Sequence, residues 1–184
     1  MDRRDLLDAL TDYRSRHPYE AEVVDRVVAL LEREPRCFER DCFTPGHVTG
    51  SAWLVDRAGA RVLLTHHRKL GRWLQLGGHA DGDEDVLRVA MREAEEESAL
   101  AVRPVETRVF DVDIHEIPAR GDGPRHRHFD VRFALTTVDG EAFRVSRESH
   151  ALQWVAIDAV SRLTDEPSML RMARKWQHRN VRND

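Results

Sequence analysis

Three glutamates, Glu93, Glu96 and Glu97, have a spacing that suits them to shared chemistry. In a helix, side chains at positions i, i+3 and i+4 lie on one face, so these three carboxylates would be neighbours. Neighbouring carboxylates repel each other until a cation lies among them, and Mg²⁺ or Mn²⁺ prefers oxygen ligands. The spacing therefore predicts a site for hard divalent cations. It also fits an acidic helix face that is only solvated, and the spacing alone does not choose between the two.

The segment around these glutamates resembles the sequence box of the Nudix hydrolases, G-x5-E-x7-R-E-U-x-E-E-x-G-U, where U is a bulky aliphatic residue. Every charged position and the leading glycine match, namely Gly78, Glu84, Arg92, Glu93, Glu96 and Glu97. Ala94 is a small version of the aliphatic position, and Ala99 stands where the box has its second glycine. Because a left-handed turn disfavours alanine by roughly 1 kcal/mol, the helix either continues past Ala99 or ends there with slight strain.

The resemblance implies a hydrolase that depends on Mg²⁺ or Mn²⁺ and cleaves a diphosphate bond in a small molecule of the type nucleoside diphosphate–X. It implies that Glu96 and Glu97 bind the metal, and that Glu93 is a ligand or the general base. Arg92 would orient Glu93 through a charge-assisted hydrogen bond. Glu84, near the start of the helix, would suit the helix dipole and fix the preceding loop.

The same resemblance implies two further metal ligands. Family members use the backbone carbonyl of the first box glycine, which is Gly78 here. They often place another glutamate ahead of a tryptophan, and Glu148 matches because it lies six residues before Trp154. His79 follows Gly78 directly, and it either caps the loop or contacts a phosphate or another part of the substrate.

Residues 105–117 and 125–138 alternate between apolar and polar side chains and predict a β-hairpin. The polar face gathers Asp111, Asp113, His115, His126, His128, Asp130 and Arg132. A solvated sheet face is usually built of Thr, Lys and Glu, so we interpret this face as a polar wall of a cleft. Plain solvent exposure and a His/Asp site for a transition metal are the alternatives. The candidate substrate contacts are therefore His79, His115, His126, His128, Asp130 and Arg132.

Hydrophobic periodicity and turn signals predict the elements that position these residues. Two helices are expected within residues 2–34, a helix from about residue 83 that carries the box glutamates, and a last helix at 166–178. Strands are expected at 47–55, 61–67, 73–76 and 146–157. The resemblance implies an α/β fold, the Nudix-type α/β/α sandwich with a mixed sheet. We expect an N-terminal helical extension (1–35), a Nudix hydrolase domain (36–164) and a C-terminal helix that packs on it (165–184).

Composition excludes several other classes of function. The 184 residues carry a net charge of −4, which argues against binding to a nucleic acid polymer. Cys37 and Cys42 indicate neither a disulfide framework nor a zinc knuckle. No apolar run is long enough for a membrane span, and a cytoplasmic location is expected by default. The expected partner is a small-molecule diphosphate, and the helical extension could also form a homodimer interface.

Three other functions remain open at this stage. A relative of isopentenyl-diphosphate isomerase would have a cysteine just before the Gly-His pair, where this chain has Gly77. A non-catalytic, nucleotide-sensing Nudix domain tends to lose box carboxylates, and this chain keeps them all. A hydrolase of non-nucleotide diphosphates is also consistent with the box, because the box does not select the substrate.

Overall fold

The computed structural model describes residues 1–119, 123–147 and 149–181. The helices are α1 (Arg3–Arg16), α2 (Ala21–Arg33), α3 (Val86–Ser98) and α4 (Pro167–Val181), with short 3-10 helices η1 (Pro18–Glu20) and η2 (Ile157–Arg162). The strands are β1 (His47–Val55), β2 (Arg61–His67), β3 (Arg72–Leu74), β4 (Leu76–His79), β5 (Val102–Ile117), β6 (His126–Thr137) and β7 (Ser149–Ala156). These elements confirm the α/β class that the sequence predicts.

The chain forms two compact units, and several helices and strands contribute residues to both. The first unit contains residues 1–51, 77–90 and 107–133, and the second contains residues 52–76, 91–106 and 134–184. The strands form a seven-stranded sheet with the order β3-β2-β1-β6-β5, in which β4 pairs with β1 and β7 with β2.

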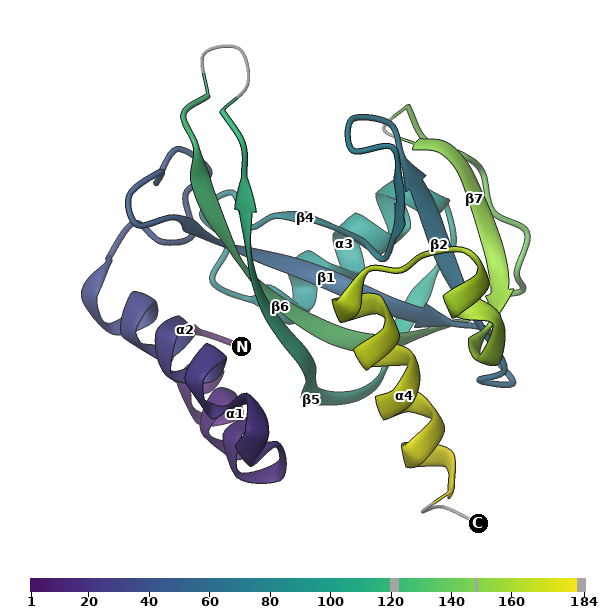
Figure 1. The fold of residues 1–184 in the computed structure, drawn as a ribbon, viewed down its shortest axis with the longest axis horizontal. Coiled ribbons are helices and arrows are strands. Elements are labelled where there is room, and N and C mark those ends of the chain that lie inside the picture. Colours follow the sequence, from purple (N-terminus) through teal and green to yellow (C-terminus); the bar gives the residue numbers. More distant parts are fainter. Residues whose placement is uncertain (120–122, 148, 182–184) are drawn as a thin grey trace. The chain divides into compact units, whose positions relative to one another are not determined.

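The first unit begins with the two helices predicted for the N-terminal segment, and α1 contacts α2 (Figure 1). Asp2 caps α1 in a capping box with Asp5, so the first turn of the helix has its backbone donors satisfied. Pro18 lies at the start of η1 and separates the helices. Leu10 and Val27 are fully buried, as the apolar stripes predict.

The second unit is organised around β2. This strand pairs antiparallel with β7 on one edge, from Arg61 opposite Ala156 to His67 opposite Ser149 (Figure 1). It also pairs antiparallel with β3. Val62, Leu63 and Leu64 in β2 are fully buried, because β2 lies in the interior of the sheet.

Helix α3, which carries the box glutamates, starts at Val86 rather than at about residue 83 as the sequence suggested. The difference arises because aspartates bond to the backbone ahead of the helix. Asp83 accepts a hydrogen bond from the amide of Asp85 at 2.9 Å, and Asp85 accepts one from the amide of Arg88 at 3.1 Å. Such bonds end the preceding loop and satisfy the first helical donors.

The C-terminal end of α3 resolves the choice left open at Ala99. The helix ends at Ser98, and Ala99 has a φ of 59°, in the left-handed region. Its amide donates to the carbonyl of Glu95 at 2.8 Å, which closes the last turn. The helix therefore ends with Ala99 in the strained left-handed conformation and does not continue past it.

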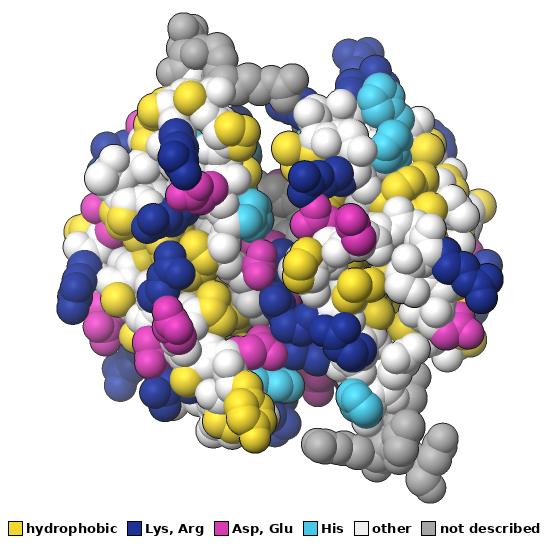
Figure 2. Space-filling view, viewed as in Figure 1, with side chains coloured by type: hydrophobic (Ala, Val, Ile, Leu, Met, Phe, Trp, Pro, Cys, Tyr) yellow, Lys and Arg dark blue, Asp and Glu magenta, His cyan; other side chains and the backbone are white. Residues whose placement is uncertain are grey.

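Helix α4 packs within the second unit through Met169, Met172 and Trp176, which are buried. The indole Nε1 of Trp176 donates to the carbonyl of Gly59 at 2.8 Å, so the helix is tied to the turn between β1 and β2. No helix in the described part of the chain is long and apolar enough to cross a membrane. Acidic and basic side chains are intermingled on the face shown in Figure 2.

Candidate functional site

The box carboxylates of the second unit differ in their environments. Glu93 is largely covered, with 16% of its side chain exposed, and accepts a hydrogen bond from Arg92 Nη2 at 2.8 Å. Glu96 is 66% exposed and lies 4.0 Å from Arg92 Nε. Glu97 is buried. Arg92 thus holds Glu93 in place by the charge-assisted bond that the sequence predicts, while Glu96 stays accessible to solvent.

These carboxylates supply the donor set that a hard cation needs. They offer oxygen ligands from successive turns of one helix, and oxygen is what Mg²⁺ and Mn²⁺ prefer. Within the described residues, however, they do not bring three ligand atoms to within 4.8 Å of one another. Like-charged carboxylates repel, and Arg92 already neutralises Glu93. The donor set fits the cation, which would draw the oxygens together.

The beginning of the box lies in the first unit, where residues of the N-terminal segment contact Glu84 and Asp85. Arg3 Nε donates to Glu84 Oε1 at 3.1 Å, and the amino group of Met1 lies 3.0 Å from Asp85 Oδ2. Glu84 was expected to fix the loop before α3, and its partner is α1. Gly78 lies half-buried on β4. Glu148, the ligand expected outside the box, falls outside the described residues.

Gly77 precedes the box at a position where the backbone admits no side chain. Its φ is +155°, and a Cβ there would lie 2.2 Å from Ser51 Oγ and 2.7 Å from Ser51 Cα. The backbone therefore approaches β1 closely at Gly77, which only glycine permits.

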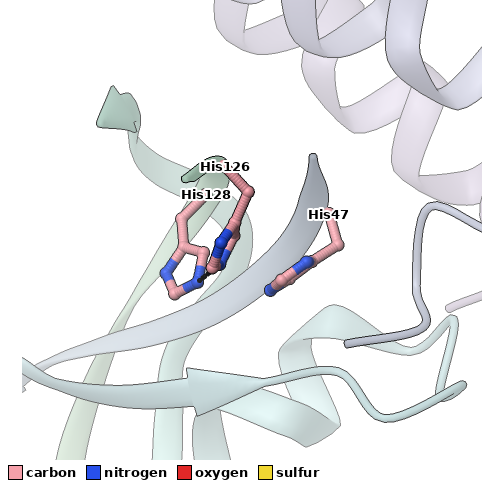
Figure 3. A group of neighbouring side chains, drawn as sticks. All are labelled: His47, His126 and His128. Carbon is pink, nitrogen blue, oxygen red and sulfur yellow. Dashed lines mark hydrogen bonds between the residues drawn. The ribbon is translucent and has the colours of Figure 1, made fainter. Parts of the chain in front are cut away.

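Four of the expected substrate contacts are histidines, and in the first unit three of them, His79, His126 and His128, surround His47, which no sequence motif indicates. Its ring centroid lies 5.0 Å from that of His126, 4.7 Å from that of His128 and 5.2 Å from that of His79. His115 lies next to His128, with centroids 5.4 Å apart. Figure 3 shows His47 on β1 facing His126 and His128 on β6.

Backbone carbonyls orient two of these rings. His47 Nδ1 lies 3.2 Å from the carbonyl oxygen of Cys42, and His126 Nδ1 lies 2.8 Å from that of Pro124. A carbonyl only accepts, so each Nδ1 carries the hydrogen and each Nε2 is left with a lone pair when the ring is neutral. Burial lowers the pKa of His47 to about 4, and burial together with the neighbouring histidines lowers that of His128 still further. The rings of His47 and His128 are therefore neutral at pH 7.

The remaining expected contacts, Asp130 and Arg132, form a buried ion network rather than the wall of a cleft. Arg132 is 2% exposed and donates to Asp130 at 2.7 Å, to Asp111 at 3.0 Å and to Asp113 at 3.3 Å. Asp130 also accepts from the hydroxyls of Thr49 at 2.9 Å and Ser51 at 2.7 Å. Because Asp111, Asp130 and Arg132 are buried, the expectation of a polar cleft wall was wrong for them, and so was its solvent-exposed alternative. The alternation in the sequence could not reveal this, because residues of both β5 and β6 faces are covered.

Comparison with known proteins identifies the family. The model of the NUDIX domain matches residues 46–176, which is most of the chain. The chain belongs to the Nudix family. No curated protein matches its sequence.

Solved Nudix structures share the fold at low sequence identity. An Ap4A hydrolase from C. elegans is 17% identical with a TM-score of 0.57, and the match covers 73% of this chain and 97% of that one. A MutT protein from Methanosarcina mazei Go1 is 18% identical with a TM-score of 0.57, covering 72% and 94%. A MutT NUDIX hydrolase from Burkholderia pseudomallei is 26% identical with a TM-score of 0.50, covering 71% and 95%.

Membership makes this Nudix protein an enzyme, a pyrophosphohydrolase. The match begins at residue 46, so the helices α1 and α2 precede the family domain. Nudix membership does not account for the histidines. His47 lies at the start of β1 with no spacing relation to His126 and His128, so only the pairing of strands could reveal the group.

Proposed function

We propose that this Nudix protein is a divalent-metal-dependent hydrolase that cleaves a diphosphate bond in a small molecule of the type nucleoside diphosphate–X. The observation that carries the proposal is the set of three box carboxylates on α3, Glu93, Glu96 and Glu97, with Glu93 held by Arg92. A diphosphate is heavily anionic and water is a poor nucleophile, so the reaction needs charge neutralisation and an activated water. A bound Mg²⁺ or Mn²⁺ would supply both.

The residues of α3 divide this work among them. Glu96 and Glu97 would hold the cation. Glu93 would act as a further ligand or take the proton from the attacking water, and its bond to Arg92 fixes the position of the carboxylate for either role. Glu84 would support the loop before the helix through its bond to Arg3.

An isomerase acting on isopentenyl diphosphate is disfavoured by the geometry at Gly77. That chemistry needs a cysteine at this position, and a Cβ there would collide with Ser51. The similar C. elegans protein is an Ap4A hydrolase, which acts on a dinucleotide, so dinucleotides belong among the first compounds to test. Nucleotide sugars, nucleoside triphosphates and non-nucleotide diphosphates complete the set.

The decisive experiment measures the two products of cleavage for each compound of this panel, a nucleoside phosphate and the phosphorylated remainder, with Mg²⁺ and with Mn²⁺, for the wild type and for Glu97→Gln. We expect the variant to lose at least about a hundredfold in kcat/KM on whichever compound is cleaved, because a metal ligand is lost while the side-chain shape is kept. Circular dichroism checks that the variant folds.

Glu95→Gln is the matched control on the same helix. Its side chain is exposed, and the remaining amide oxygen of glutamine can still accept the hydrogen bond that Glu95 Oε1 accepts from Val102 at 3.2 Å. Its activity should equal that of the wild type. Near-wild-type turnover in Glu97→Gln, or no cleavage of any compound with either metal, would contradict the proposal.

A further inference from the structure

Three histidines of the first unit, His47, His126 and His128, have ring nitrogens close to one another. One ring nitrogen from each of His47, His126 and His128 lies within 4.8 Å of the other two (Figure 3). His126 Nε2 and His128 Nε2 are 3.3 Å apart. This separation is what two ligands of one tetrahedral zinc ion require, since Zn–N bonds of about 2.05 Å at the tetrahedral angle place the nitrogens roughly 3.3 Å apart.

A second observation is independent of this spacing. His47 is 1% exposed, and its buried Nε2 has no hydrogen-bond partner among the described residues. A buried polar atom normally has a partner, because an unsatisfied one costs about 1–3 kcal/mol. The lone pair of this nitrogen is available because Nδ1 carries the hydrogen and donates to the carbonyl of Cys42.

The outer contacts of the group also match those of metal-binding histidines. Such histidines donate the second ring N–H to a carbonyl or carboxylate, which fixes the ring and leaves the other nitrogen for the metal. Cys42 provides this carbonyl for His47 and Pro124 provides it for His126. Both rings are therefore held in the tautomer that directs Nε2 as a ligand.

We propose that His47, His126 and His128 bind one transition-metal cation of borderline softness, with Zn²⁺ as the ion that fits best. Imidazole suits such cations, whereas Mg²⁺ prefers oxygen, so this site is chemically distinct from the carboxylates of α3. The described residues of the group supply three ligands. Three protein nitrogens leave a fourth tetrahedral position for water or for an oxygen of a bound molecule.

The test titrates the metal-free full chain with Zn²⁺ alone, in the presence of excess Mg²⁺ to occupy carboxylate sites. We expect one Zn²⁺ per chain in the wild type, and an increase in thermal midpoint that follows the metal concentration. Co²⁺ is the spectroscopic probe, because its visible absorption reports tetrahedral nitrogen coordination. His126→Ala and His128→Ala should each weaken Zn²⁺ binding by about 100-fold or more.

Two controls separate this site from others. His178→Ala removes an exposed histidine of α4 and should leave Zn²⁺ binding unchanged. Glu97→Gln should also bind Zn²⁺ as the wild type does, whatever its activity, so failure of this site is distinguishable from failure of the proposed hydrolase. His126 is half-buried, so its variant is expected to fold, and circular dichroism without metal checks this. The proposal is overturned if the wild type binds no Zn²⁺, if both histidine variants bind it normally, or if only Glu97→Gln loses it.

Discussion

Replacement of Arg132 by methionine should destabilise the fold severely, because it removes a guanidinium from the centre of a buried acidic network. The guanidinium bonds Asp130, Asp111 and Asp113, of which the first two are 1% and 0% exposed. Methionine fills similar space but takes this counter-charge away from the buried carboxylates. Breaking a buried ion pair from one side costs about 3–5 kcal/mol. That is a large part of the roughly 5–15 kcal/mol by which domains are typically stable.

The hydroxyls of Thr49 and Ser51 limit the loss but do not prevent it. They still donate to Asp130 in the variant, while Asp111 loses the bond from Arg132. We therefore expect a loss of about 3 kcal/mol or more in the free energy of unfolding, measured by urea denaturation followed by circular dichroism.

Asp113→Asn is the matched control for this network. Its side chain is 23% exposed, and its oxygen lies 3.3 Å from Arg132, so the guanidinium keeps both shorter bonds. This variant should lose about 1 kcal/mol or less. A loss below about 1 kcal/mol in Arg132→Met, with an unchanged denaturant slope, would refute the reasoning that the guanidinium neutralises the network.

Two further predictions concern the end of α3 and the buried thiols. Ala99→Gly should stabilise the protein by roughly 1 kcal/mol, seen as a higher thermal midpoint, because glycine relieves the φ of 59°. Ala101→Gly, at an exposed position without positive φ, should destabilise slightly, and equal effects of the two changes would contradict this explanation. Burial raises the pKa of the Cys37 thiol to about 11, so at pH 8 its thiolate fraction is roughly a thousandth and its alkylation should be very slow until urea exposes it. Mass spectrometry after iodoacetamide treatment measures this, and rapid native modification of Cys37 would contradict it.

The family could be predicted from the sequence because the box is local. Its glutamates, arginine and leading glycine are separated by fixed intervals along one short strand, the loop that follows it and one helix, so spacing along the chain is enough to identify the box. The strands 47–55 and 61–67 were also predicted with their observed bounds, because turn residues mark both ends of each. By contrast, the start of α3 depends on aspartate side chains that bond to the backbone, and the sequence placed it about three residues early.

Only the tertiary structure decided which polar side chains are buried and which residues distant in sequence come together. The polar face of the hairpin looked like a cleft wall in the sequence, yet Arg132 and two of its aspartates are enclosed. His47 precedes His126 by 79 positions, and their rings stack only because β1 and β6 are neighbours in the sheet. Alternation tells which side chains share a face of one strand. Which strands lie next to each other, and what covers them, depends on contacts distant in sequence that no local pattern records.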